Sequence, residues 1–194
     1  MRFEDGYPCD TYSTDKNDSP RLNGMMVLCD VPGFIDLNMY RVGNDLVRYI
    51  GHDIKDMSRD QILPLCAAYK YLNEMDVNFE YAIQLLIDKK VAPNGDWLSP
   101  THIGFLKSCL GQRVNWYERI FIEADIVWST KIKPYGESNQ ILAILMVLGN
   151  SYLRKYCKMH PDWKEPIISY WSKSWRKELD VATAIVKKVE SLIK

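Results

Sequence analysis

Cys157 and His160 are the side chains whose types and spacing come nearest to an active site. They lie three positions apart in "YCKMH", a spacing that places both on one face of a helix. A thiol beside an imidazole is a nucleophile–base pair, but it requires a third group to orient the base. Two ligands are also too few for a zinc site. The pair therefore favours a structural role, and we expect neither a metal nor another cofactor.

The remainder of the sequence contains no familiar catalytic motif. It has no glycine-rich phosphate loop and no CxxC, HExxH or GxSxG pattern. The five cysteines are odd in number and scattered through apolar segments, which favours reduced thiols in the cytosol or nucleus over disulfides. The sequence thus predicts a protein without enzymatic activity, and an enzyme that uses Cys157 is the weakest of the hypotheses considered.

Basic side chains near the end of the chain form a second candidate site. The formal net charge is zero, but residues 1–60 carry a net charge of −4 and residues 154–194 carry +5. A basic end favours contact with a polyanion such as lipid headgroups or RNA. The candidate residues are Arg154, Lys155, Lys158, Lys173, Arg176 and Lys177. A solvated helix face is the simpler alternative, and contact between the acidic front of one copy and the basic rear of another would give self-assembly.

The elements that would position these residues are helical, and the clearest one spans residues 99–110. Ser99 is a good N-cap, Pro100 suits the first helical position, and Gly111 can end the helix in a left-handed turn. Two adjacent apolar stripes run along it, formed by Ile103, Leu106 and Leu110 and by Phe105 and Cys109. Two apolar stripes on so short a helix predict burial on nearly all sides.

Cap signals predict further helices on both sides of this one. Asn44, Ser58 and Asp76 are each placed to begin a helix. Another helix is expected over 114–128, and its apolar residues are Trp116, Tyr117, Ile120, Phe121, Ala124 and Val127. A very apolar helix should run from Ser138 to about residue 157, although Gly149 weakens it.

The two ends of the chain complete the predicted organisation. A long amphipathic helix should begin at Pro166 and continue to the last residues. Residues 1–43 are expected to form a short extended arm, in which 24–34 is the one candidate strand. The predicted fold is an all-α, multi-helix bundle of two packed helical subdomains, 44–128 and 138–194.

The order and spacing of these helices resemble the orthomyxovirus matrix protein family. The segment "LSPTHIGFLKSCL" (98–110) resembles the family's Leu-Ser-Pro-capped helix. "NDLVRYIGHDIKDMSRDQILPLCAAYKYL" (44–72) is similar to its first two helices, and "DVNFEYAIQLLIDKKVAPNGDWLSP" (76–100) to its third. "NWYERIFIEADI" (115–126) corresponds to a short linker helix, and 138–194 resembles the family's middle domain in layout alone.

The resemblance implies a viral matrix protein, which self-assembles beneath the envelope and links the membrane to ribonucleoprotein. Its partners would be other copies of itself, an anionic membrane surface and viral ribonucleoprotein or RNA. Its location would be the inner face of the virion envelope, and the host cytoplasm and nucleus during infection.

Because of two departures from the family pattern, any polyanion contact would have to lie elsewhere in the chain than it does in the family. The family's basic cluster is missing from the helix at 138–153, which only Lys131 and Lys133 precede, and its Cys/Cys/His/His cluster is not reproduced. The additional 43 residues at the start suggest a divergent genus such as a thogotovirus or an isavirus. The alternative function is a Bcl-2-like viral adaptor that holds a partner helix in a groove, for which 138–157 would be the long central helix.

Overall fold

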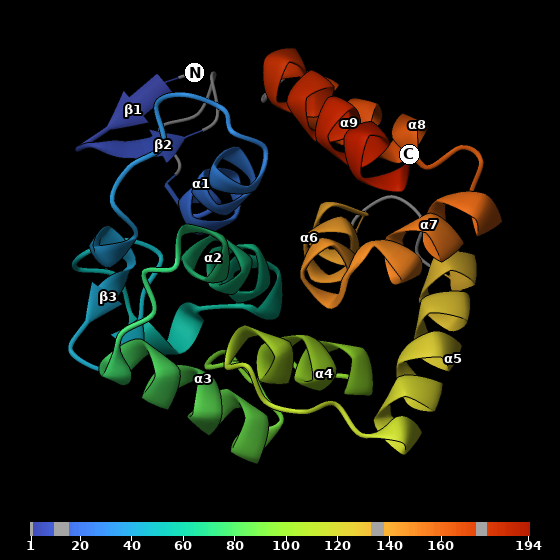
Figure 1. Cartoon of the computed structure of the whole chain (residues 1–194). Coiled ribbons are helices and arrows are strands. Elements are labelled where there is room, and N and C mark those ends of the chain that lie inside the picture. Colours follow the sequence, from blue (N-terminus) through green and yellow to red (C-terminus); the bar gives the residue numbers. More distant parts are fainter. Residues whose placement is uncertain (1, 10–15, 133–137, 174–177) are drawn as a thin grey trace.

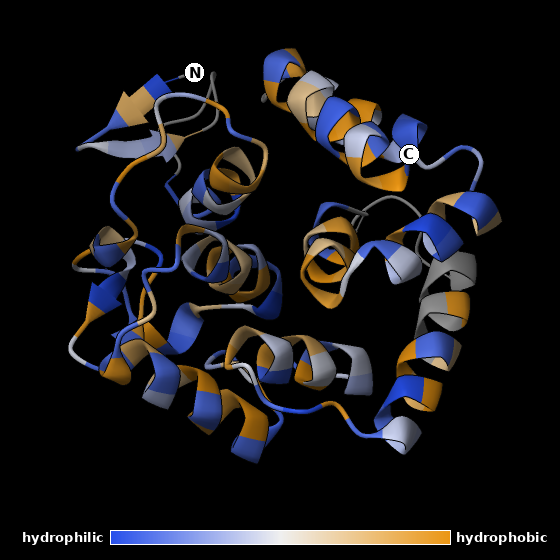
Figure 2. Ribbon diagram, in the orientation of Figure 1, coloured by the Kyte–Doolittle hydropathy of each residue, from blue (hydrophilic) through white to orange (hydrophobic). Residues whose placement is uncertain are grey.

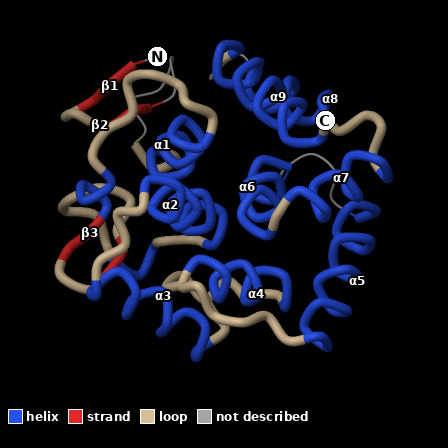
Figure 3. Tube along the Cα trace, in the orientation of Figure 1, coloured by secondary structure: helices blue, strands red, loops and turns tan. Residues whose placement is uncertain are grey.

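The computed structural model describes residues 2–9, 16–132, 138–173 and 178–194 (Figure 3). The helices are α1 Ser19–Leu28, α2 Arg59–Leu72, α3 Val77–Lys89, α4 Pro100–Cys109, α5 Trp116–Ile132, α6 Ser138–Leu148, α7 Asn150–Met159, α8 Lys164–Ser172 and α9 Leu179–Ile193, with 3-10 turns η1 Leu37–Tyr40 and η2 Ile54–Asp56. The strands of the described residues form two short antiparallel hairpins, in which β1 Arg2–Glu4 pairs with β2 Tyr7–Cys9 and β3 Arg41–Val42 pairs with β4 Asp45–Leu46. The predicted all-α, multi-helix fold is confirmed.

Helix α1 packs against α2 and also contacts α6 and α9; in Figure 1 it lies above α2, between the β1–β2 hairpin and α9. Each of its ten residues is buried. A Cβ atom placed on Gly24 would lie 2.6 Å from the backbone carbonyl of Pro64, so glycine allows the backbones of α1 and α2 to cross closely. One continuous apolar core extends from this crossing through α4 and α6 to α8 and α9.

A buried cation reinforces the contact between α1 and its neighbours. The guanidinium group of Arg21 forms ion pairs with Asp18 and, at 3.1 Å, with Asp60 at the start of α2. The same group lies 5.0 Å from the centre of the Tyr170 ring on α8. A buried charge is stable only when it is paired in this way. Arg21 thus connects the first helix to an element almost 150 positions later in the chain.

Several helix boundaries agree with the sequence-based predictions. Ser99 is the N-cap of α4 and accepts a hydrogen bond from the backbone N–H of His102, while the His102 ring accepts one from the backbone N–H of Ser99. Gly111, with φ of +68°, follows the end of that helix. Ser58 and Asp76 precede α2 and α3 as predicted, and the Asp76 carboxylate accepts from the backbone N–H of Phe79.

The predicted arm over 1–43 is wrong for its second half. Residues 19–28 form α1, and the candidate strand 24–34 begins inside that helix. A helix that is buried on every side has no polar face, so its sequence lacks the periodicity by which amphipathic helices are recognised. Residues 2–9 are extended, as predicted, but they form the β1–β2 hairpin.

The helix predicted to begin at Asn44 is also wrong. The chain instead turns at Gly43, which has φ of +61°, and forms the β3–β4 hairpin. A second glycine with positive φ, Gly51, follows before η2. Leu46 and Val47 are still buried, as their apolar character suggests, but they are positioned by a hairpin.

The two long helices predicted in the second half are each interrupted. Gly149 adopts φ of +114° and separates α6 from α7, so there is no continuous helix over 138–157. This break removes the long central helix on which the adaptor alternative depended. The final predicted helix begins at Lys164, two residues before Pro166, and is divided into α8 and α9.

Candidate interaction surfaces

The Cys157–His160 pair is not arranged as a nucleophile and its base. Both residues are located at the end of α7, but no hydrogen bond joins the thiol to the imidazole. Burial raises the pKa of Cys157 to about 11, so the thiol is protonated at neutral pH and is a poor nucleophile. Among the described residues, no three His, Cys, Asp or Glu side chains gather as a metal site requires.

Three of the predicted basic residues share the exposed face of α7. Arg154, Lys155 and Lys158 face solvent, while Leu153 and Tyr156 point into the core. Two of these cations already have partners in the chain. Arg154 donates from Nε to the carbonyl of Ile193 at 3.2 Å, near the end of α9, and Lys155 pairs with Glu123 of α5. Lys158 is exposed at the end of the helix.

The other predicted basic residues belong to a different part of the fold. Lys173 follows α8, and its ammonium group lies 5.7 Å from the centre of the Tyr170 ring. Arg176 and Lys177 fall outside the described residues. The structure therefore brings Arg154, Lys155 and Lys158 onto one helix face, whereas Lys173 is on another element.

The acidic front and the basic rear of the chain are in contact at the surface of a single copy. Lys188 of α9 donates to the Asp30 carboxylate at 2.7 Å and to the Tyr71 hydroxyl at 3.1 Å. The hydrogen bonds from Lys188 and Tyr71 hold the pKa of Asp30 below its usual value. Some of the opposite charges at the two ends of the sequence therefore pair with each other within one copy.

A second surface, which we call the α5 face, consists of Trp116, Tyr117, Ile120 and Phe121. These side chains are 74%, 47%, 58% and 57% exposed, and Ala124 beside them is exposed as well. Figure 2 shows apolar residues, in orange, on the turns of α5, which runs along one edge of the molecule. The apolar residues expected on this helix therefore face solvent over this part of α5.

The opposite side of α5 provides the contact with the rest of the protein. Ile122 is fully buried and packs over Gly104 of α4, where an added Cβ would lie 2.5 Å from Cδ1 of Ile122. Glu118 pairs with Lys107 and accepts a hydrogen bond from the backbone N–H of Asn115. These contacts fix the orientation of α5 and turn its aromatic stripe outward.

A third surface, the α3 face, consists of Val77, Glu80, Tyr81, Gln84 and Asp88. These residues recur at spacings of three and four, so they share one side of the helix. Val77 is 80% exposed and Tyr81 is 52% exposed. Beside them lies an open hollow of about 280 Å³, which Leu110 and Gln112 complete. Gln112 donates to the Gln84 side chain at 2.8 Å, which links the two walls of the hollow.

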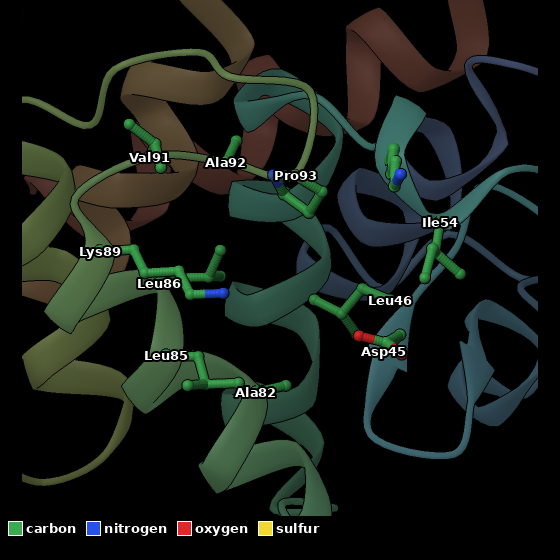
Figure 4. A pocket seen from close by; sticks show the side chains of 11 residues that line it. Asp45, Leu46, Ile54, Ala82, Leu85, Leu86, Lys89, Val91, Ala92 and Pro93 are labelled. Carbon is green, nitrogen blue, oxygen red and sulfur yellow. The ribbon is translucent and has the colours of Figure 1, made fainter.

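A small cleft lies on the other side of α3, between that helix and the β4–η2 region. Figure 4 shows Leu46 and Ile54 on one side and Leu85 and Lys89 on the other. Its volume is about 310 Å³, at the lower limit for a pocket that holds a small molecule. The charged groups at its rim, such as Lys89 and Lys55, are exposed, so the cleft has no buried polar group that would select a ligand.

Comparisons with known proteins leave the function to be argued from these surfaces. No protein-family model, curated protein or solved structure matches the chain. In the part of the chain that the structure describes, no helix is long and apolar enough to cross a membrane. The sequence identifies the apolar residues of the α5 face but not their outward direction, because the helical spacing is the same whether a stripe packs inward or outward.

Proposed function

We propose that the protein is a non-enzymatic structural protein of the viral-matrix kind, which self-assembles into a layer beneath a membrane and links it to ribonucleoprotein. The outward α5 face carries this proposal. A cluster of large apolar side chains at one surface marks an interaction site, because isolated proteins keep such patches small. The resemblance of residues 59–110 to the orthomyxovirus matrix family supports the identity of the layer, whereas a hairpin at β3–β4 replaces the expected first helix.

The size of the α5 face favours a layer over a tight dimer. Full burial of a large apolar side chain contributes about 1.5–3 kcal/mol. The four residues of the α5 face are only about half to three-quarters exposed in one copy, so together they would contribute about 4–7 kcal/mol, toward the lower end of the cost of about 4–15 kcal/mol for bringing two proteins together. One such contact is therefore weak, whereas many copies with repeated contacts hold together.

The basic face of α7 supports the membrane and ribonucleoprotein part of the proposal. Each Lys or Arg near an anionic surface contributes about 1 kcal/mol. Arg154, Lys155 and Lys158 are exposed together, although the first two also make contacts within the chain. We therefore propose a weak polyanion contact that becomes effective when an assembled layer presents many copies. Such a layer would lie at the inner face of the envelope.

Sedimentation velocity of the full chain at rising protein concentration tests self-assembly. The wild type should form larger species, and more of them at low ionic strength than at high. Trp116→Ser together with Phe121→Ser should shift the protein toward monomer because the α5 face loses its largest side chains. Trp97→Ser is a matched control, since Trp97 is 60% exposed and belongs to the loop before α4. A wild type that stays monomeric at every concentration and salt level would refute self-assembly.

Cosedimentation with vesicles of phosphatidylcholine and phosphatidylserine, and with single-stranded RNA, tests the polyanion contact. Substitution of Arg154, Lys155 and Lys158 by Ala should weaken binding and flatten its salt dependence. Lys187→Ala serves as the control because Lys187 is exposed on α9. If the triple variant binds as well as the wild type, the α7 face is not the polyanion site.

A further inference from the structure

We infer that the α5 face of one copy docks on the α3 face of the next copy. This inference rests on the proposed self-assembly and specifies which surfaces meet. Both surfaces expose large apolar side chains, at helices that the chain itself leaves uncovered on one side. Their shapes and their charges are complementary.

The complementarity of shape comes from the hollow beside the α3 face. Aromatic side chains project from the α5 face, and Trp116 is the most exposed of them. The hollow of about 280 Å³ has Val77, Tyr81 and Leu110 as its apolar walls. Glu80, Gln84 and Gln112 complete the lining, so the hollow offers apolar walls together with polar groups to which the indole N–H of a docked Trp116 ring could donate a hydrogen bond.

The complementarity of charge comes from residues at the edges of the two faces. Arg119 and Arg113 are exposed on the Trp116 side of the α5 face, where both line the hollow between α5, α4 and α7. The acidic residues near them, Glu118 and Glu123, are already paired with Lys107 and Lys155. The edge of the α5 face is therefore basic.

The α3 face carries the opposite charge. Glu80 and Asp88 belong to it, and Glu74 lies just before the helix; all three are exposed. Within the described part of the chain Glu80 forms no ion pair, and Asp76 nearby is occupied by Arg41. Opposite charges at the edges of two apolar surfaces set their register and speed their encounter.

The position of the two faces determines the kind of assembly. Figure 1 places α3 along the lower edge of the molecule and α5 along the right-hand edge. A contact between two different surfaces is heterologous, and it propagates from copy to copy unless the rotation closes a ring. Docking of this kind produces a row of copies, and a layer would form when such rows associate side by side.

The charge pattern favours a second copy over a membrane as the occupant of the α5 face. Helices that lie in a membrane surface have many Lys and Arg residues on their polar side. Among the described side chains of α5 the one basic residue is Arg119, and the acids Glu118 and Glu123 are paired with Lys107 and Lys155. The α3 face of a second copy, in contrast, carries both exposed apolar side chains and acidic charge, so it complements the α5 face.

Charge reversal tests the pairing of the two faces. Arg119→Glu and Glu80→Arg should each lower the association constant by about ten-fold, because attraction is replaced by repulsion. An equimolar mixture of the two variants should regain assembly, since the acidic α5 face of one then meets the basic α3 face of the other. Lys187→Glu and Glu165→Arg reverse exposed charges elsewhere, on α9 and α8, and should leave association unchanged. Thermal unfolding of each variant checks that it is folded.

The possible outcomes separate this inference from the proposed function. A wild type that assembles, with Glu80→Arg having no effect and no recovery in the mixture, overturns the docking of α5 on α3 but leaves self-assembly intact. A Trp116→Ala variant that loses vesicle binding and keeps full assembly shows that the α5 face meets lipid, which also overturns the inference. A wild type that remains monomeric overturns both proposals.

Discussion

Helices α4 and α5 are neighbours in the chain and in space, but the protein treats their apolar residues in opposite ways. Phe105, Leu106 and Cys109 of α4 are buried by the surrounding helices. The longer apolar stripe of α5 lies in solvent, and Ile122 on the other side makes the contact with α4. The comparison shows that a periodic apolar stripe identifies a surface that requires a partner, while the partner can be the same chain or another one.

The largest expected difference between the two helices is in stability. Leu106→Ala should lower the free energy of unfolding by about 2–5 kcal/mol because it leaves a cavity in a fully buried site. Phe121→Ala on α5 removes a larger side chain but should change the stability of the monomer by less than about 0.5 kcal/mol. Urea unfolding at low protein concentration measures both. Equal losses would mean that α5 is covered within one copy.

A smaller difference is expected between two glycines at helix contacts. Gly24→Ala should destabilise the protein by about 1–3 kcal/mol, since the new methyl group meets the rigid backbone of Pro64. Gly104→Ala should be much milder, because its methyl group meets the end of the Ile122 side chain, which can move, and alanine favours a helix. The midpoints of thermal unfolding compare the two. If both variants unfold at the same temperature, the α1–α2 crossing is less tightly packed than described.

The smallest effect concerns the exposed ion pair that connects the two ends of the chain. The pKa of Asp30 is lowered in the folded protein by its hydrogen bonds to Lys188 and Tyr71. The pair therefore stabilises the fold above the unfolded pKa of about 3.9, and this contribution is lost as the pH falls through the folded pKa. Asp30→Asn should cost about 0–1 kcal/mol at pH 7 and almost nothing near pH 2. A pH-independent difference between variant and wild type in urea unfolding would contradict this assignment.

The elements that the sequence predicts well are those with local signals. Ser99 and Asp76 make their cap hydrogen bonds with residues three positions away, so their role is visible in a short segment. Helix α1 has no such signal, because Ser19–Leu28 is buried on every side and its partners lie far along the chain. Its burial on every side depends on tertiary packing that composition does not reveal.

The candidate surfaces show the same limit. The exposed basic face of α7 follows from the spacing of Arg154, Lys155 and Lys158, which the sequence contains. The internal partners of two of these residues, Ile193 and Glu123, become visible in three dimensions alone. The direction of the α5 stripe likewise depends on contacts with α4, where Ile122 packs over Gly104 and Glu118 pairs with Lys107.

The burial of α1 by elements that come later in the chain has a consequence for synthesis on the ribosome. This helix leaves the exit tunnel before most of the surfaces that cover it, which arrive with α2, α6 and α9. The bond between Asp30 and Lys188 spans 158 positions, so α9 can close over α1 only after the intervening helices have emerged. Until then the apolar residues of α1, including Met25 and Met26, lack their native cover and present a binding site for chaperones.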